Sequence, residues 1–150
     1  MRNLLAIAMA TALWSGAAFA GENGLIVKPS PYSVADTLNR LEAAVTEGGS
    51  VIVARIDHAA AAQKVGKKLR PTQLLVWGNP AVGTPLMAAA PAAGIDLPQK
   101  FLAWQDDDGK VWVAYNSFVY IGHRHKISGM DDTLAVLDSR LEALTSKALQ

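Results

Sequence analysis

Residues 100–115 read KFLAWQDDDGKVWVAY, and this stretch decides the fold that the sequence predicts. Lys100 to Gln105 is an apolar and aromatic run, which favours a β-strand. Asp106 to Gly109 predicts a tight turn, because Asp and Gly accept the backbone angles of a short chain reversal. Lys110 to Tyr115 is a second run of the same character that returns antiparallel. The stretch therefore predicts a β-hairpin.

Strands and helices alternate on the N-terminal side of this hairpin. Ser33 stands three residues before Asp36, a spacing that resembles a capping box at the start of a helix. Asp57 is placed to cap a second, shorter helix. The expected strands are residues 25–27, 51–56 and 73–77, and the second of these is a β-branched run typical of a buried strand. The first expected helix begins at Val34 and ends before Gly48-Gly49. The second begins at His58 and ends before Gly66.

Two further helices complete the predicted set. Thr84 followed by Pro85 is typical of an N-cap and a first helical position, so a helix is expected from there to about Ala93, bent or interrupted by Pro91. The last helix runs from about Asp131 to Lys147, with a leucine stripe at positions 134, 137, 141 and 144. This order predicts an α+β fold, a compact two-layer domain whose mixed sheet has helices packed on it.

The N-terminus has the features of a cleavable signal peptide. Arg2 precedes an uncharged apolar run, and Ala18-Phe19-Ala20 supplies the small residues that signal peptidase requires. We expect residues 1–20 to be removed, residues 21–150 to form a single domain, and the protein to be periplasmic, although secretion is an alternative. The other interpretation, a membrane anchor, needs an apolar run longer than this one.

Composition excludes several classes of protein. The chain has 14 Lys and Arg against 13 Asp and Glu, and losing Arg2 with the leader would balance them. A balanced charge argues against a nucleic-acid partner and against electrostatic membrane binding after cleavage. The chain has no Cys, which excludes a lipid tether on cysteine, disulfides, thiolate nucleophiles and cysteine-based zinc sites.

Several ordered motifs resemble those of the domain of unknown function 302 family. They are Asn79-Pro80-x-x-Gly83-Thr84-Pro85-Leu86-Met87, Pro91, Asp96-Leu97-Pro98-x-Lys100, Asp108-Gly109-Lys110-Val111-Trp112, Tyr115-Asn116 and Tyr120-x-x-x-Arg124-His125. The family pattern usually has Pro soon after the Tyr-Asn pair, where this chain has Ser117-Phe118. The resemblance implies a small α+β fold, often exported, in which some members form homodimers. It implies no agreed activity and no cofactor.

The loop from Gly78 to Pro85 is the most unusual stretch of the sequence. Its two glycines have the spacing of a P-loop, but Thr84 and Pro85 stand where phosphate chemistry requires Lys and Ser or Thr. A strand-loop-helix junction can still present backbone donors to a small anion or carboxylate, which Asn79 would orient. The simpler interpretation, a turn at Asn79-Pro80 and a helix cap at Thr84, is favoured.

Three histidines raise the alternative of a metal-handling protein. His123 and His125 would share one face of a strand, and His58, Met87 or Met130 could complete a site for copper or zinc. If the segment is helical instead, the two imidazoles diverge.

An aromatic-lined pocket near Asn79 is the preferred candidate site. We expect Asn79, Gly83 and Thr84 to present polar contacts, Lys100 and Arg124 the charge, and Trp77 an apolar wall, with Asn116 also assigned to ligand binding. The predicted function is a non-enzymatic binding or accessory domain for a small anionic or amphipathic ligand. An unrecognised enzyme is the remaining alternative, and it requires Asn79, Tyr115, Asn116 and a His or Asp to converge.

Overall fold

The computed structural model describes residues 19–20 and 23–150 of the chain. The predicted leader therefore lies outside the described residues, except for Phe19–Ala20, which form the short strand β1. In the described part, no helix has both the length and the apolar character that crossing a membrane requires.

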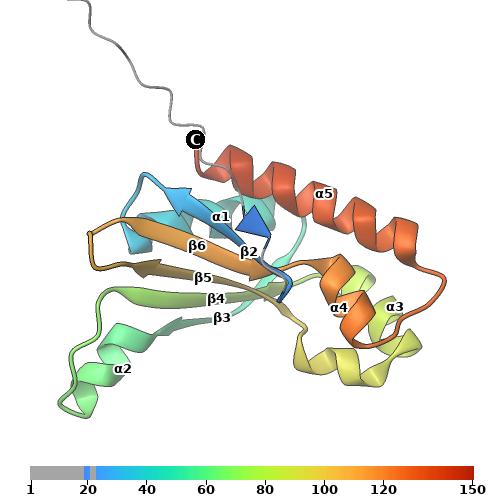
Figure 1. Ribbon diagram of the computed structural model, residues 1–150, viewed down its shortest axis with the longest axis horizontal. Coiled ribbons are helices and arrows are strands. Elements are labelled where there is room, and N and C mark those ends of the chain that lie inside the picture. The colour runs from blue at the N-terminus through green and yellow to red at the C-terminus, as the bar shows by residue number, and fades with distance from the viewer. Residues whose placement is uncertain (1–18, 21–22) are drawn as a thin grey trace, which may run out of the picture.

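Within the described residues, the sheet contains six strands in the order β1-β2-β6-β5-β4-β3 (Figure 1). The hairpin predicted from residues 100–115 is β5–β6. Its turn is held by Asp106, whose carboxylate accepts hydrogen bonds from the backbone N–H groups of Asp108 and Lys110 at 3.0 and 2.9 Å. After β1, the strands are β2 (Leu25–Ser30), β3 (Val51–Asp57), β4 (Thr72–Gly78), β5 (Gln99–Gln105) and β6 (Val111–Asn116).

The α+β fold agrees with the sequence, but the sheet is antiparallel rather than mixed. Every neighbouring pair of described strands runs antiparallel. The crossover through the first helix joins β2 to β3, which run in the same direction but are separated by β6, β5 and β4. Alternating strands and helices therefore produce no parallel neighbours here.

The helices begin largely where the predicted caps stand. Ser33 Oγ accepts a hydrogen bond from the Asp36 N–H at 3.1 Å, and Asp57 Oδ1 accepts one from the Ala60 N–H at 2.8 Å, as the sequence predicted. The bounds are α1 (Val34–Glu47), α2 (His58–Lys64), α3 (Pro80–Ala89), a 3₁₀ helix η1 (Pro91–Ile95), α4 (Phe118–Arg124) and α5 (Asp131–Ala148).

Helix α3 begins five residues earlier than expected. Its N-cap is Asn79, whose side chain accepts a hydrogen bond from the Ala81 N–H at 2.9 Å, and Pro80 takes the first helical position. Pro85 lies inside the helix. Asn79-Pro80 and Thr84-Pro85 are the same kind of cap-proline pair, and the chain uses the first one.

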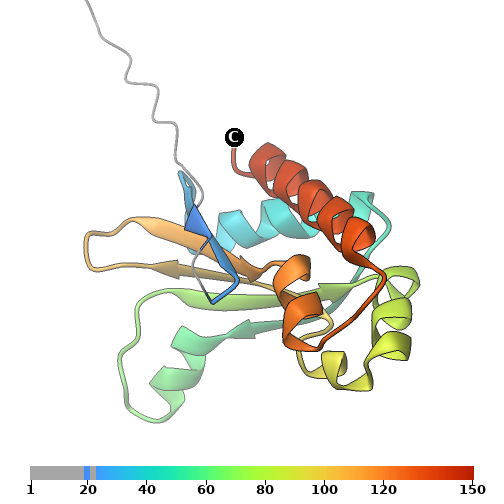
Figure 2. The ribbon, with the colours of Figure 1, turned by 45° about the vertical axis from the view of Figure 1, so that its right-hand side comes forward.

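Helices α1 and α5 cover one face of the sheet (Figures 1 and 2). On that face Trp77 stacks on Phe101 with ring centroids 5.2 Å apart, and Tyr115 meets Phe101 edge-on. Trp104 and Trp112 pair across β5 and β6 on the opposite face and are half-buried. Strand β3 was expected to be buried but forms the sheet edge, where Val53 is 58% exposed.

Candidate functional site

A pocket of about 410 Å³ opens beside the last residues of β4. We call it the Trp77 pocket. Helices α3 and α5 supply two of its walls, and the start of β3 and the segment before β5 supply the others. Its volume is within the range of small-molecule sites. The lining is mostly apolar and includes Val53, Trp77, Val82, Leu97, Phe118, Leu137, Leu141 and Leu144.

Four residues of the predicted site line this pocket: Trp77, Asn79, Gly83 and Thr84. Trp77 points to the helix-covered face because it alternates with its neighbours along β4. Asn79 is occupied as the cap of α3, and its side-chain nitrogen also contacts the Gly49 carbonyl at 3.4 Å. The predicted polar group at the start of α3 is thus mainly structural.

Lys100 does not reach the pocket. Gln99 points toward Trp77 on the helix-covered face, so strand alternation turns Lys100 to the opposite face. Its Nζ donates hydrogen bonds to the carbonyl oxygens of Asp96 and Pro98 at 2.7 and 2.8 Å. Burial lowers the pKa of Lys100, and the nearby carboxylate of Asp96 offsets part of that effect.

Arg124 also lies outside the pocket lining, in a cluster around Asp96. The Asp96 carboxylate is almost fully buried and accepts a hydrogen bond from Arg124 Nη1 at 3.2 Å. His125 Nε2 lies 2.6 Å from the other oxygen of the same carboxylate. These contacts fasten the end of α4 to the segment between η1 and β5, which gives both residues a structural role.

The segment of His123 and His125 is helical, so the strand geometry required for a shared metal site is absent. His123 is exposed and His125 is turned to Asp96. Within the described residues, no group of three or more His, Cys, Asp or Glu side chains is arranged to hold a metal ion. The metal alternative therefore loses the geometry on which it depended.

The residues named for an enzyme are dispersed. Asn116 ends β6 and accepts a hydrogen bond at its carbonyl oxygen from Gln99 Nε2 at 3.0 Å. Tyr115 donates its hydroxyl to Glu142 Oε2 at 3.2 Å, and Asn79 caps α3. The lining of the Trp77 pocket includes Asn79 but neither Tyr115 nor Asn116.

A pocket residue that the sequence did not indicate is Arg140 on α5. It is exposed, lines the pocket, and makes no hydrogen bond or ion pair with any residue that the structure describes. Its signal was present in the sequence: Arg140 stands three residues after Leu137 and four before Leu144, on the border of the leucine stripe. Gln99, buried beside Trp77, was also missed.

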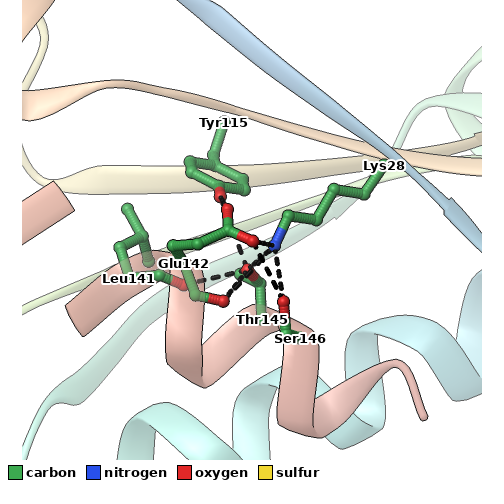
Figure 3. Close-up of polar contacts among 6 residues, drawn as sticks. All are labelled: Lys28, Tyr115, Leu141, Glu142, Thr145 and Ser146. Atoms are coloured by element: carbon green, nitrogen blue, oxygen red, sulfur yellow. Dashed lines mark hydrogen bonds and ion pairs between the residues drawn. The ribbon is translucent and has the colours of Figure 1, made fainter. Parts of the chain in front are cut away.

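A second polar cluster joins β2 to α5 through Lys28 (Figure 3). Lys28 Nζ donates to Glu142 Oε1 at 2.6 Å, to Thr145 Oγ1 at 2.7 Å and to Ser146 Oγ at 3.0 Å. Three acceptors saturate the three protons of an ammonium group, so this lysine is a structural link rather than a free charge.

The same cluster shifts the pKa values of Tyr115 and Glu142 in opposite directions. Burial raises the pKa of Tyr115, and the neighbouring Glu142 carboxylate adds to the rise. Burial also raises the pKa of Glu142, but hydrogen bonds from Lys28, Ser146 and Tyr115 and the charge of Lys28 outweigh it, so the net pKa is lowered. Tyr115 is thereby held as a neutral donor and Glu142 as an anion.

The fold and pocket define a small α+β protein with an antiparallel sheet covered by helices on one face. The chain belongs to the family described as domain of unknown function DUF302, whose model matches residues 26–144. The resemblance drawn from the motifs is thereby confirmed. The crystal structure of an uncharacterised conserved DUF302 protein from Bacillus stearothermophilus has the same fold, with a TM-score of 0.74 and 16% identity over 85% of this chain and 98% of that one.

Similar proteins also occur as parts of longer chains. Two proteins named fluoride-specific ion channel FluC 1, from Brucella suis biovar 1 and Brucella abortus biovar 1, are 38% identical to this chain over 115 residues. The match covers 77% of this chain but 45% and 42% of those relatives. The chain thus spans less than half the length of the curated relatives it matches.

Proposed function

We propose that this chain is an exported, non-enzymatic domain that binds a small amphipathic anion in the Trp77 pocket and acts as an accessory module. The observation that carries the proposal is the combination of a mostly apolar cavity with one exposed arginine at its wall. Arg140 makes no ion pair with a described residue, so its charge is available to a ligand.

The two parts of the pocket would contribute differently to binding. Burying apolar surface stabilises a complex by roughly 25 cal/mol per Å², so the apolar walls would supply most of the affinity. An exposed ion pair contributes only about 0–1 kcal/mol, so Arg140 would mainly orient the ligand with its anionic group toward solvent. A ligand with an apolar body and one negative end satisfies both features.

An accessory role is supported by the longer relatives. Those proteins are named as fluoride channels, and less than half of each corresponds to this chain. We assign the channel activity to the remainder of those proteins and a binding role to the shared domain. Export to the periplasm is part of the proposal and rests on the leader-like residues 1–20.

Isothermal titration calorimetry on the purified protein tests the proposal. The probes are decanoate and decanol, which share a chain length and differ in the anionic group. We expect decanoate to bind and to raise the melting temperature, decanol to bind more weakly, and Arg140→Gln to remove the difference between them.

Arg124→Gln is the matched control, because it removes the same charge from a residue outside the pocket lining. It should leave the preference for decanoate intact. Absence of heat and of thermal stabilisation with both probes, and with shorter and longer homologues, would contradict the proposal.

A further inference from the structure

Strand β3 is an edge of the sheet that begins beside the Trp77 pocket (Figure 1). It pairs with β4 on one side, and on its other side no described residue forms a hydrogen bond with its backbone. Val51 and Val53 are 56% and 58% exposed and line the pocket. The free backbone donors and acceptors of this edge therefore lie next to the apolar cavity.

The outer side of β3 lacks the usual protection of an edge strand. Proteins commonly guard such edges with proline or with charged side chains. Strand β3 contains no proline, and its two charged side chains are engaged elsewhere. Arg55 donates a hydrogen bond to Asn39 Oδ1 at 2.6 Å, and Asp57 caps α2 by accepting from the Ala60 N–H at 2.8 Å. Neither charge is therefore directed at a strand that approaches this edge.

A β-bulge connects the edge to the pocket. The register between β3 and β4 shifts between Ile52 and Ala54, which leaves Val53 as the extra residue. Bulges redirect side chains, and this one accompanies a valine that joins the pocket lining. Because a bulge also discourages pairing along a whole strand, a strand added here would be short and would pair with the beginning of β3.

The pocket has a cation on its α5 wall. Arg140 is exposed, lines the pocket and makes no hydrogen bond or ion pair with a described residue. A ligand that uses every one of these features needs an extended backbone, an apolar side chain and a negative charge. The C-terminal end of a peptide has all three, and peptides do bind by adding a strand to a free sheet edge. A fatty acid would leave the edge unpaired.

We infer that the ligand of the Trp77 pocket is the C-terminal end of an extended peptide. The peptide adds a short strand to the beginning of β3, its last side chain enters the apolar cavity, and its carboxylate faces Arg140. It runs antiparallel to β3, because its C-terminus must lie at the pocket, where β3 begins. This inference rests on the proposed function and adds the chemical class of the ligand.

Calorimetry with modified peptides tests the strand addition. The probe is an acetylated pentapeptide of alternating threonine and valine that ends in leucine. Two further forms carry N-methyl groups on alternate backbone nitrogens, so that each form blocks one edge of the extended peptide. We expect one of these forms to bind about tenfold more weakly, through the loss of backbone hydrogen bonds, and the other to bind nearly as well as the parent peptide.

The carboxylate is tested with the C-terminal amide of the same peptide. The free acid should bind up to about fivefold more tightly than the amide, as expected for an exposed ion pair. Arg140→Gln should remove this preference. The control Arg124→Gln should retain it, because Arg124 lies outside the pocket lining.

Amide hydrogen exchange locates the peptide on the unsubstituted protein. With peptide at about ten times its dissociation constant, outward-facing amides of residues 51–57 should exchange about tenfold more slowly. Decanoate should leave their exchange rates unchanged, since it offers no backbone to the strand. The amides of β2, at the far side of the sheet, should not respond to either probe.

Three outcomes would contradict these expectations. Equal binding of the two N-methylated forms, with β3 unprotected and decanoate still bound, would overturn the peptide inference and leave the proposed function standing. Protection of β3 that rises with protein concentration in the absence of peptide would assign the edge to a second copy of the chain and would also overturn the inference. Absence of binding by decanoate and by all the peptides would overturn the proposed function itself.

Discussion

Lys28 is a cation that the fold removes almost completely from water. Its side chain is 7% exposed, and its partners are all on α5. We predict that Lys28→Met lowers the free energy of unfolding by about 1–3 kcal/mol, because Thr145 and Ser146 lose a charged donor. Glu142 is half-exposed and regains hydration, which keeps the loss below that of a fully buried pair. Urea unfolding measures the change in the free energy of unfolding. The control is Lys68→Met, which replaces an exposed lysine and should leave the stability nearly unchanged.

The partner carboxylate makes this link dependent on pH. The pKa of Glu142 is lower in the folded state than in the unfolded chain. The stability that its ionisation contributes is therefore fully present above the unfolded pKa and is lost as the pH falls through the folded pKa. We predict that Glu142→Gln is less stable than the parent near neutral pH and that the two converge in acid. A constant difference between the melting curves at all pH values would contradict this.

Residues of the site were predictable where residue type and local position decided their role. Trp77 was placed correctly beside the pocket because an aromatic residue at a strand end carries a local signal. Asn79 was expected to form a turn or to contact a ligand, and instead it caps α3. Lys100 was misplaced because its side depends on strand parity, and the neighbouring Gln99 occupies the pocket side instead. Arg140 was missed because its position on the border of the leucine stripe does not reveal a pocket until the elements packed opposite the stripe are known.

At the scale of elements, Gly24 sets the approach of α4 to β2. A Cβ at this position would lie 1.9 Å from Tyr120 Cγ, and its φ of +74° is left-handed. We predict that Gly24→Ala costs several kcal/mol (the left-handed backbone alone costs roughly 1–2 kcal/mol), measured by urea unfolding. Gly66→Ala is the matched control, with a φ of +70° and nothing within 4 Å of the added Cβ. It isolates the backbone cost, so equal losses in both variants would refute the steric account.

Gly83 affects both helix α3 and the pocket. A Cβ there would meet Met87 Cε at 3.8 Å and Leu97 Cδ1 at 3.9 Å, ordinary contact distances. Gly83→Ala should therefore raise stability by about 0.5–1 kcal/mol through helix propensity. Gly83→Leu should be tolerated but weaken decanoate binding, because the larger side chain occupies the pocket. Melting temperature and calorimetry separate the two effects, and an unchanged decanoate affinity in Gly83→Leu would count against the pocket as the site.

The starts of α1 and α2 followed local chemistry, whereas the start of α3 and the burial of β3 did not. Caps at Ser33 and Asp57 depend on side-chain hydrogen bonds within three residues, which a sequence displays directly. The β-branched run of β3 was read as buried, but β-branched residues favour any extended strand, including one at an edge. Its exposed valines became interpretable only with the strand order.

At the scale of the whole molecule, the predicted two layers are present. The order of the strands in the antiparallel sheet depends on a long connection between β2 and β3. The crossover through α1 carries the chain from β2 across the sheet to its far edge at β3. The local periodicity of the sequence identifies strands and helices. It does not predict how many strands lie between the two strands that a crossover connects. Homodimer formation likewise depends on the surfaces between two chains, so the expected homodimer stays a prediction.

The leader prediction has a consequence for the sheet itself. Strand β1 pairs with Ile26 and Val27 of β2, so cleavage after Ala20 would leave β2 as the sheet edge. Pro29 in β2 fits an edge, because a proline has no N–H to give to a neighbouring strand. We predict that mass spectrometry of the exported protein gives an N-terminus at Gly21, and that Ala18→Asp blocks processing. Because β1 contributes only two residues to the sheet, the processed protein should melt within a few degrees of the unprocessed one (a small domain shifts by roughly 4–8 °C per kcal/mol). An exported protein that retains residues 1–20 would contradict the prediction and make β1 a permanent part of the sheet.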